Sequence, residues 1–119
     1  MARILVADDQ ATMRQIIGEM LREKGHTVTV VEDGQAAYES AQANDFDLIV
    51  ADVNMPRLDG LEFLKKIKAA KPGLKVIFVT GMLEETIRIG SAELGLDGLI
   101  MKPFEKGAAV ELIEKILAR

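Results

Sequence analysis

The stretch Leu48–Ala51, sequence LIVA, runs directly into an aspartate, Asp52. Its four apolar residues stand on successive positions, as expected for a strand of a parallel sheet that helices cover on both faces. Four other runs of strand length lie before and after it, at Ala2–Ala7, Thr27–Val31, Val76–Val79 and Leu99–Met101. Stretches of helical period separate the runs, so the sequence predicts five successive strand–helix units.

The segment between the first two strands has the clearest helical pattern. Its apolar residues follow the spacing i, i+3, i+4, i+7 and i+8, and we expect the whole stripe to lie in the core: Met13, Ile16, Ile17, Met20 and Leu21. Gly25 is the candidate C-cap of this helix, because glycine readily adopts the left-handed conformation that ends many helices.

Four further helices are predicted along the chain. Asp33 is the candidate N-cap of a helix over about Gln35–Ala43, and Asp59 with Glu62 forms a capping-box pattern at the start of the third helix. The third helix is expected to bury Leu61, Leu64 and Ile67, and the last helix Leu112, Ile113 and Ile116. The fourth, about Leu83–Leu94, has the weakest signal because a glycine and β-branched residues lie inside it.

Chain length and composition agree with a single domain over residues 1–119. A chain of 119 residues is of ordinary size for one domain, and 49% hydrophobic residues with a mean hydropathy of +0.14 provide enough apolar surface for a core. Five strand–helix units with right-handed crossovers form an α/β fold, a doubly wound parallel sheet with helices on both faces.

Composition also excludes several kinds of function. The chain has no cysteine and one histidine, which rules out disulfides and zinc or iron–sulfur sites built from cysteine. A net charge of −4 disfavours direct binding to nucleic acid or anionic membranes. There is no long apolar run and no signal-peptide pattern, so we expect a cytoplasmic protein.

Residues with reactive side chains follow four of the five predicted strands. Asp8 and Asp9 follow the first strand, Asp52 the third, Thr80 the fourth and Lys102 the fifth. In an open α/β sheet ligands bind beyond the carboxyl ends of the strands, so these groups are expected at one site. Three carboxylates together favour a hard divalent cation such as Mg²⁺. A hydroxyl, an ammonium and a metal around one carboxylate form a receptor for a phosphoryl group, with Asp52 as the nucleophile.

Each of these residues also has a simpler interpretation. Asp8 or Asp9 alone is a plausible cap of the first helix, and Asp52, Thr80 and Lys102 alone suit turns. Their shared position at the strand ends favours the functional interpretation. His26 is expected to be a solvated loop residue, and dinucleotide, NTPase and serine-hydrolase motifs are absent from the sequence.

From end to end the chain resembles a response-regulator receiver domain of the CheY-like kind. The similarity lies in four stretches: ILVADD at 4–9, DLIVADVNMPRLDG at 47–60, VIFVTG at 76–81 and LIMKPF at 99–104. The resemblance implies a flavodoxin-like sheet of five strands in the order 2-1-3-4-5. It also implies that Asp52 receives a phosphoryl group from the phosphohistidine of a sensor histidine kinase or a phosphotransfer protein.

The resemblance assigns roles to the site residues one by one. Asp8 and Asp9 resemble the acidic pair that binds Mg²⁺ together with Asp52. Asn54 resembles the residue whose backbone carbonyl completes the coordination shell of this ion. Thr80 and Lys102 resemble the hydroxyl and the lysine that contact the phosphoryl oxygens. The Lys102–Pro103 peptide resembles one that is cis in the family. Leu99 departs from the family, since many members carry an aromatic residue there.

The leading hypothesis is a phosphorylation-controlled binding switch in two-component signalling, either a stand-alone regulator or the receiver of a larger one. It is not a turnover enzyme in this hypothesis; its chemistry is Mg²⁺-dependent self-phosphorylation and autodephosphorylation. The face formed by the fourth helix, fifth strand and fifth helix is expected to select the downstream protein, with these exposed candidates: Arg88, Ile89, Glu93, Lys106 and Val110.

Two alternatives belong to other classes of function. One is a small phosphatase or phosphotransferase that uses Asp52 as a turnover nucleophile, although Asn54 leaves no second acid at Asp-x-Asp spacing. The other is an interaction module that keeps the fold without being phosphorylated.

Overall fold

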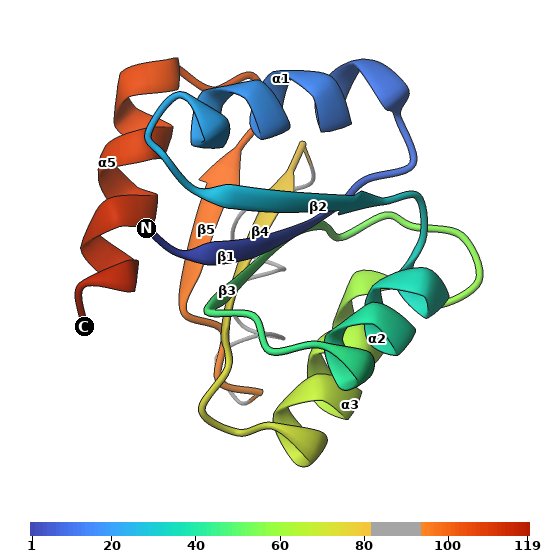
Figure 1. Ribbon diagram of the computed structural model, residues 1–119. Coiled ribbons are helices and arrows are strands. Elements are labelled where there is room, and N and C mark those ends of the chain that lie inside the picture. The colour runs from blue at the N-terminus through green and yellow to red at the C-terminus, as the bar shows by residue number, and fades with distance from the viewer. Residues whose placement is uncertain (82–93) are drawn as a thin grey trace.

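A five-stranded parallel sheet with helices on both faces forms the protein, as predicted (Figure 1). The computed structural model describes residues 1–81 and 94–119, so the predicted helix at about Leu83–Leu94 lies almost wholly outside the described residues. The strands stand in the order β2-β1-β3-β4-β5. Their bounds are β1 Arg3–Ala7, β2 Thr27–Val31, β3 Leu48–Asp52, β4 Lys75–Thr80 and β5 Gly98–Met101.

Two hydrophobic cores lie on opposite faces of the sheet. Helices α1 (Ala11–Arg22) and α5 (Lys106–Leu117) cover one face, and α2 (Gly34–Ala43) and α3 (Gly60–Ala70) cover the other (Figure 1). Strand β3 contributes to both, since Leu48 and Val50 belong to the α1/α5 side while Ile49 and Ala51 belong to the α2/α3 side. This double burial explains why the LIVA run shows no alternation.

The predicted helix caps are confirmed for α2 and α3. The Asp33 side chain accepts a hydrogen bond from the Ala36 N–H, and the Asp59 side chain accepts one from the Glu62 N–H. Helix α1 instead ends at Arg22, and Gly25 follows three residues later with a φ of 87°, where it turns the chain toward β2.

Helices α2 and α3 contact each other on their side of the sheet. The Lys66 ammonium of α3 lies over the ring of Tyr38 on α2, 5.4 Å from its centroid. Within α2, the Gln42 side chain donates a hydrogen bond to the Tyr38 hydroxyl at 2.7 Å. The aromatic ring therefore lies between the two helices rather than in open solvent.

Some predictions of burial are wrong in detail. Ile16 is 46% exposed, because the core-facing side of α1 is narrower than the apolar stripe. Leu61 and Leu112 are only half-buried, and Phe63 is the fully buried residue of α3 that the pattern missed. Val110, predicted to be exposed, is buried, because it faces the core on the α1 side of α5.

The expectation that His26 is a solvated loop residue is also wrong. His26 is buried, its Nδ1 accepts a hydrogen bond from the Ala2 N–H at 3.0 Å, and its Nε2 lies 2.7 Å from Glu114 Oε1. Accepting at Nδ1 places the ring proton on Nε2, which then donates to Glu114. One imidazole thus joins the residue before β1, the α1–β2 turn and α5.

We predict that His26→Ala destabilises the fold by about 1–3 kcal/mol, because the buried Ala2 N–H loses its acceptor. Urea unfolding at neutral pH measures this loss. Glu114→Gln keeps an acceptor for the Nε2 proton and is expected to cost less than half as much. A His26→Ala variant as stable as the parent protein would contradict this account of the imidazole.

Candidate functional site

The strand ends bring the predicted site residues to one edge of the sheet. Residue Ala7 of β1 pairs with Ala51 of β3, and Thr80 of β4 pairs with Met101 of β5. Asp52 is the last residue of β3 and pairs with Val79 of β4. The residues at or just beyond these ends therefore lie side by side across four adjacent strands.

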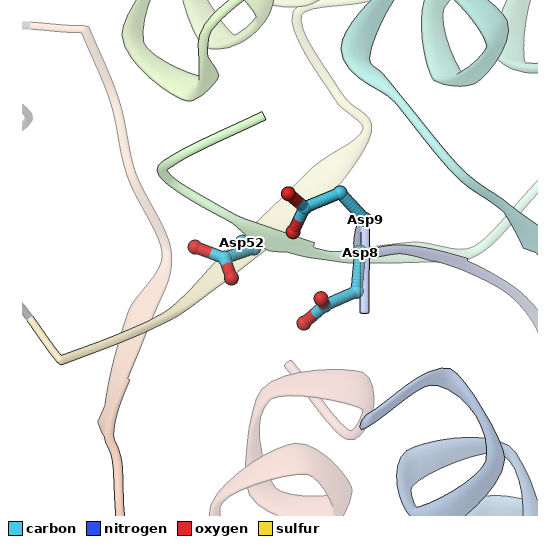
Figure 2. A group of neighbouring side chains, drawn as sticks. All are labelled: Asp8, Asp9 and Asp52. Atoms are coloured by element: carbon cyan, nitrogen blue, oxygen red, sulfur yellow. The ribbon is translucent and has the colours of Figure 1, made fainter. Parts of the chain in front are cut away.

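An acidic cluster forms at this edge, as the sequence predicted. One carboxylate oxygen from each of Asp8, Asp9 and Asp52 lies within 4.8 Å of the others, and Figure 2 shows the three side chains converging. Asp8 and Asp52 are buried, with 1% and 7% of their surface exposed, whereas Asp9 is exposed. The cluster is thus open to solvent on the Asp9 side.

Neither Asp8 nor Asp9 caps α1, so this simpler interpretation does not hold. The residue at the N-cap is Gln10, and its side chain makes no capping hydrogen bond. Asp8 Oδ1 instead accepts a hydrogen bond from the Gln10 N–H at 2.9 Å. The Arg14 side chain, which no sequence motif singles out, donates a hydrogen bond to the Asp8 carbonyl oxygen at 2.7 Å.

The Lys102 ammonium is a counter-charge to the acidic cluster. Its Nζ lies 2.7 Å from Asp52 Oδ2 and 3.4 Å from Asp8 Oδ2. The Lys102 N–H also donates to the Thr80 carbonyl oxygen at 2.7 Å, which ties the ends of β4 and β5 together. The Lys102–Pro103 peptide is cis, as the resemblance implied, and Thr80 is buried at the end of β4.

Burial and charge shift the protonation of two of these groups. Burial raises the pKa of Asp8 above its usual value, although the Gln10 N–H and Lys102 act in the opposite direction. Burial alone lowers the pKa of Lys102, but its hydrogen bond to Asp52 and the charges of Asp52 and Asp8 outweigh this effect and raise it. The lysine is therefore held in its charged form, whereas burial favours the protonated form of Asp8.

The two oxygens of the Asp52 carboxylate have different partners. Oδ1 accepts a hydrogen bond from the Asn54 N–H at 2.9 Å, and Oδ2 faces Lys102. The Asn54 contact belongs to the loop between β3 and α3, which begins immediately after Asp52. The orientation of this carboxylate consequently depends on the path of that loop.

The β3–α3 loop is packed against the protein rather than extended into solvent. Val53, Met55 and Leu58 are all buried in the α2/α3 core. The Gly60 N–H donates to the Val53 carbonyl oxygen at 2.8 Å and closes the base of the loop. A Cβ at position 60 would lie 2.7 Å from Val53 Cα, so only glycine fits there without a shift.

The donor set fits a hard divalent cation. Three carboxylates within 4.8 Å of one another supply oxygen ligands, and a cation among them would offset their mutual repulsion. Lys102 neutralises part of the charge but leaves the solvent side of the cluster open. Asp8, Asp9 and Asp52 are brought together as predicted, and Asn54 lies next to them.

Comparison with known proteins places the chain in a family. A model of the response regulator receiver domain matches residues 4–114. The chain is 37% identical to the chemotaxis protein CheY of Pseudomonas aeruginosa, over 98% of this chain and 97% of that protein. Among the helices in the described part of the chain, none is long and apolar enough to cross a membrane.

Solved structures show the same fold. The chemotaxis response regulator CheY4 of Vibrio cholerae superimposes with a TM-score of 0.91 at 28% identity, over 98% of each chain. The receiver domain of a sensor histidine kinase of Pseudomonas aeruginosa, with a magnesium ion coordinated in its active-site cleft, gives a TM-score of 0.89 at 28% identity, over 99% of this chain and 98% of that one. This chain therefore belongs to the response regulator receiver domain family of two-component signalling, with CheY-type proteins among its relatives.

Proposed function

We propose that Asp52 is a phosphoacceptor and that its phosphorylation switches the binding of this protein to a downstream protein. The donor is the phosphohistidine of a sensor histidine kinase or of a phosphotransfer protein. The observation that carries the proposal is the environment of Asp52, whose carboxylate ends a buried strand, faces Lys102 at 2.7 Å and lies within the acidic cluster. An ion pair between Asp52 and Lys102 that only stabilised the fold would not need the carboxylates of Asp8 and Asp9 next to it.

The transfer step uses residues of this chain for positioning and charge. A carboxylate oxygen of Asp52 attacks the phosphorus atom, the bond from phosphorus to the histidine nitrogen breaks, and the imidazole leaves with the electron pair of that bond. The Asn54 N–H donates a hydrogen bond to Asp52 Oδ1 and so fixes the orientation of the carboxylate. In this proposal Lys102 and Thr80 contact oxygens of the incoming phosphoryl group.

Asp8, Asp9, Asp52 and the backbone carbonyl of Asn54 would hold Mg²⁺. When bound, the ion neutralises charge on the phosphoryl oxygens and on the carboxylates during transfer. In this proposal the protein acts as a switch with its own phosphorylation and dephosphorylation chemistry, not as a turnover enzyme.

The proposed output runs through the ends of β4 and β5 to the face that α5 forms with β5; the fourth helix that the sequence predicts for this face lies outside the described residues. The backbone hydrogen bond from Lys102 to Thr80 couples the two strand ends, so a shift of either group moves both. Of the two predicted candidates on α5, Lys106 is exposed but pairs with Glu23, directly after α1, and Val110 is buried on the α1 side of α5, so neither supports this face. The candidates Arg88, Ile89 and Glu93 lie outside the described residues.

We predict that incubation with Mg²⁺ and acetyl phosphate adds a single phosphoryl group, seen by intact mass spectrometry. Asp52→Asn keeps an acceptor for the Asn54 N–H but has no nucleophilic carboxylate, so the adduct is expected to be absent. EDTA added before acetyl phosphate is expected to prevent adduct formation in the parent protein.

Two results would contradict the proposed switch. An adduct of the same yield in Asp52→Asn would place the chemistry on another residue. Repeated turnover of a phosphate ester by the parent protein would favour the phosphatase alternative instead.

Asp8→Asn is predicted to stabilise the metal-free protein at neutral pH. Because burial raises the pKa of Asp8, the folded protein holds this proton to a higher pH than the unfolded chain does. The stabilising contribution of protonated Asp8 is lost as the pH rises from the pKa of Asp8 in the unfolded chain through its raised pKa in the folded protein. This contribution is therefore absent at neutral pH. An asparagine carries no charge there and still accepts from the Gln10 N–H.

Thermal unfolding with and without Mg²⁺ measures this effect. We expect Mg²⁺ to raise the midpoint of the parent protein and to have little effect on Asp8→Asn, which lacks a metal ligand. Asp45→Asn, a substitution at a fully exposed carboxylate away from the site, serves as the control. A midpoint for Asp8→Asn below that of the parent protein without Mg²⁺ would contradict the prediction.

A further inference from the structure

The start of α2 lies against the β3–α3 loop at an unusually close distance. A Cβ built on Gly34 would overlap the Leu58 carbonyl oxygen and lie 2.8 Å from the Leu58 carbonyl carbon. The obstacle is backbone, which cannot rotate away as the end of a side chain can. The backbone of the loop occupies the space that a Cβ at position 34 would need, so only glycine fits there without a shift.

Side chains reinforce this contact to different degrees. Leu58 is 5% exposed and fills the α2/α3 core beneath the loop. Asp33 caps α2 through Oδ1, and its Oδ2 lies 3.7 Å from Arg57 Nε. The Arg57 side chain is 73% exposed, so this ion pair contributes little. The contact of Gly34 with Leu58 holds the loop, and the ion pair is secondary.

The same loop sets the orientation of Asp52. It is closed at its base by the hydrogen bond from Gly60 to Val53 and held against α2 by the contact of Leu58, two residues before Gly60, with Gly34. Arg57, which directly precedes Leu58, has a φ of 71°, a backbone conformation that few residues other than glycine adopt. The first turn of the loop includes the Asn54 N–H that binds Asp52 Oδ1.

We propose that Gly34 and Leu58 are positioning residues for Asp52 and for the proposed Mg²⁺ site. They hold the β3–α3 loop against α2, and through it they fix the Asn54 backbone, which orients the Asp52 carboxylate. This inference rests on the proposed function, because it assigns to residues outside the acidic cluster a role in metal binding and phosphorylation. Helix α2, which contributes no residue to the cluster, thereby becomes part of the site.

A matched pair of leucines separates this role from plain stability. Leu58 and Leu74 are 5% and 7% exposed, belong to the same core cluster, and lie in loops at opposite ends of the sheet. Leu58→Ala and Leu74→Ala remove the same atoms, so similar losses of stability are expected from both. Only Leu58→Ala releases the loop that holds Asn54.

Three measurements are made on both variants and on the parent protein, well below their unfolding temperatures. They are amide hydrogen exchange of Asn54 by NMR, Mg²⁺ affinity by calorimetry, and the rate of adduct formation with acetyl phosphate. Leu58→Ala is expected to speed Asn54 exchange, and to weaken Mg²⁺ binding and slow phosphorylation by about tenfold, since small misplacements of reacting groups have effects of this size. Leu74→Ala is expected to match the parent protein in all three.

Equal behaviour of Leu58→Ala and Leu74→Ala would overturn the inference. If the parent protein forms no adduct, the proposed function fails. Asn54 exchange and Mg²⁺ affinity still test the inference in that case, because neither requires phosphorylation.

Gly34→Ala is the second variant, and it acts through the backbone contact rather than through core volume. Its control is Gly98→Ala, where a Cβ would meet the flexible end of the Ile116 side chain at the other end of the sheet. Faster Asn54 exchange in Gly34→Ala alone would support the inference. The same change in both variants would contradict it.

Discussion

Complete burial of β3 is the constraint on which the rest of the structure depends. The strand pairs with β1 on one side and β4 on the other, and each of its five residues is buried. Such a strand has no freedom to shift its register without exposing apolar residues or breaking two ladders of hydrogen bonds. Asp52, its last residue, is therefore placed by the whole sheet, with Asp8 brought to it at the end of β1 and Lys102 at the end of β5, beyond β4.

The site that results is unfavourable in electrostatic terms without a bound cation. Asp8, Asp9 and Asp52 contribute −3 and Lys102 contributes +1, so half of the net charge of −4 is concentrated at one edge of the sheet. One ammonium, that of Lys102, lies among three carboxylates, two of them buried. A fold selected for stability alone would not retain this arrangement, and its cost is consistent with a role in binding and chemistry.

Sequence patterns predicted the fold and the convergence of the site because both follow from local features. Continuous apolar runs indicated strands with two covered faces, and polar residues at strand ends indicated one shared edge. Patterns failed where the decisive contact joins distant parts of the chain. The imidazole of the buried His26 is hydrogen-bonded to Glu114, 88 residues away. Nothing near Gly34 in the sequence shows that Leu58 approaches it, although a glycine in the first turn of a helix is a weak signal.

The ring that lies between α2 and α3 has a practical consequence. The protein contains one tyrosine and no tryptophan, so Tyr38 dominates its intrinsic near-ultraviolet fluorescence. Tyr38 stands one helical turn after Gly34, on the same face of α2, under the Lys66 ammonium. The native protein thus carries a single optical reporter on the helix that touches the β3–α3 loop, and no introduced label is needed to follow that helix in solution.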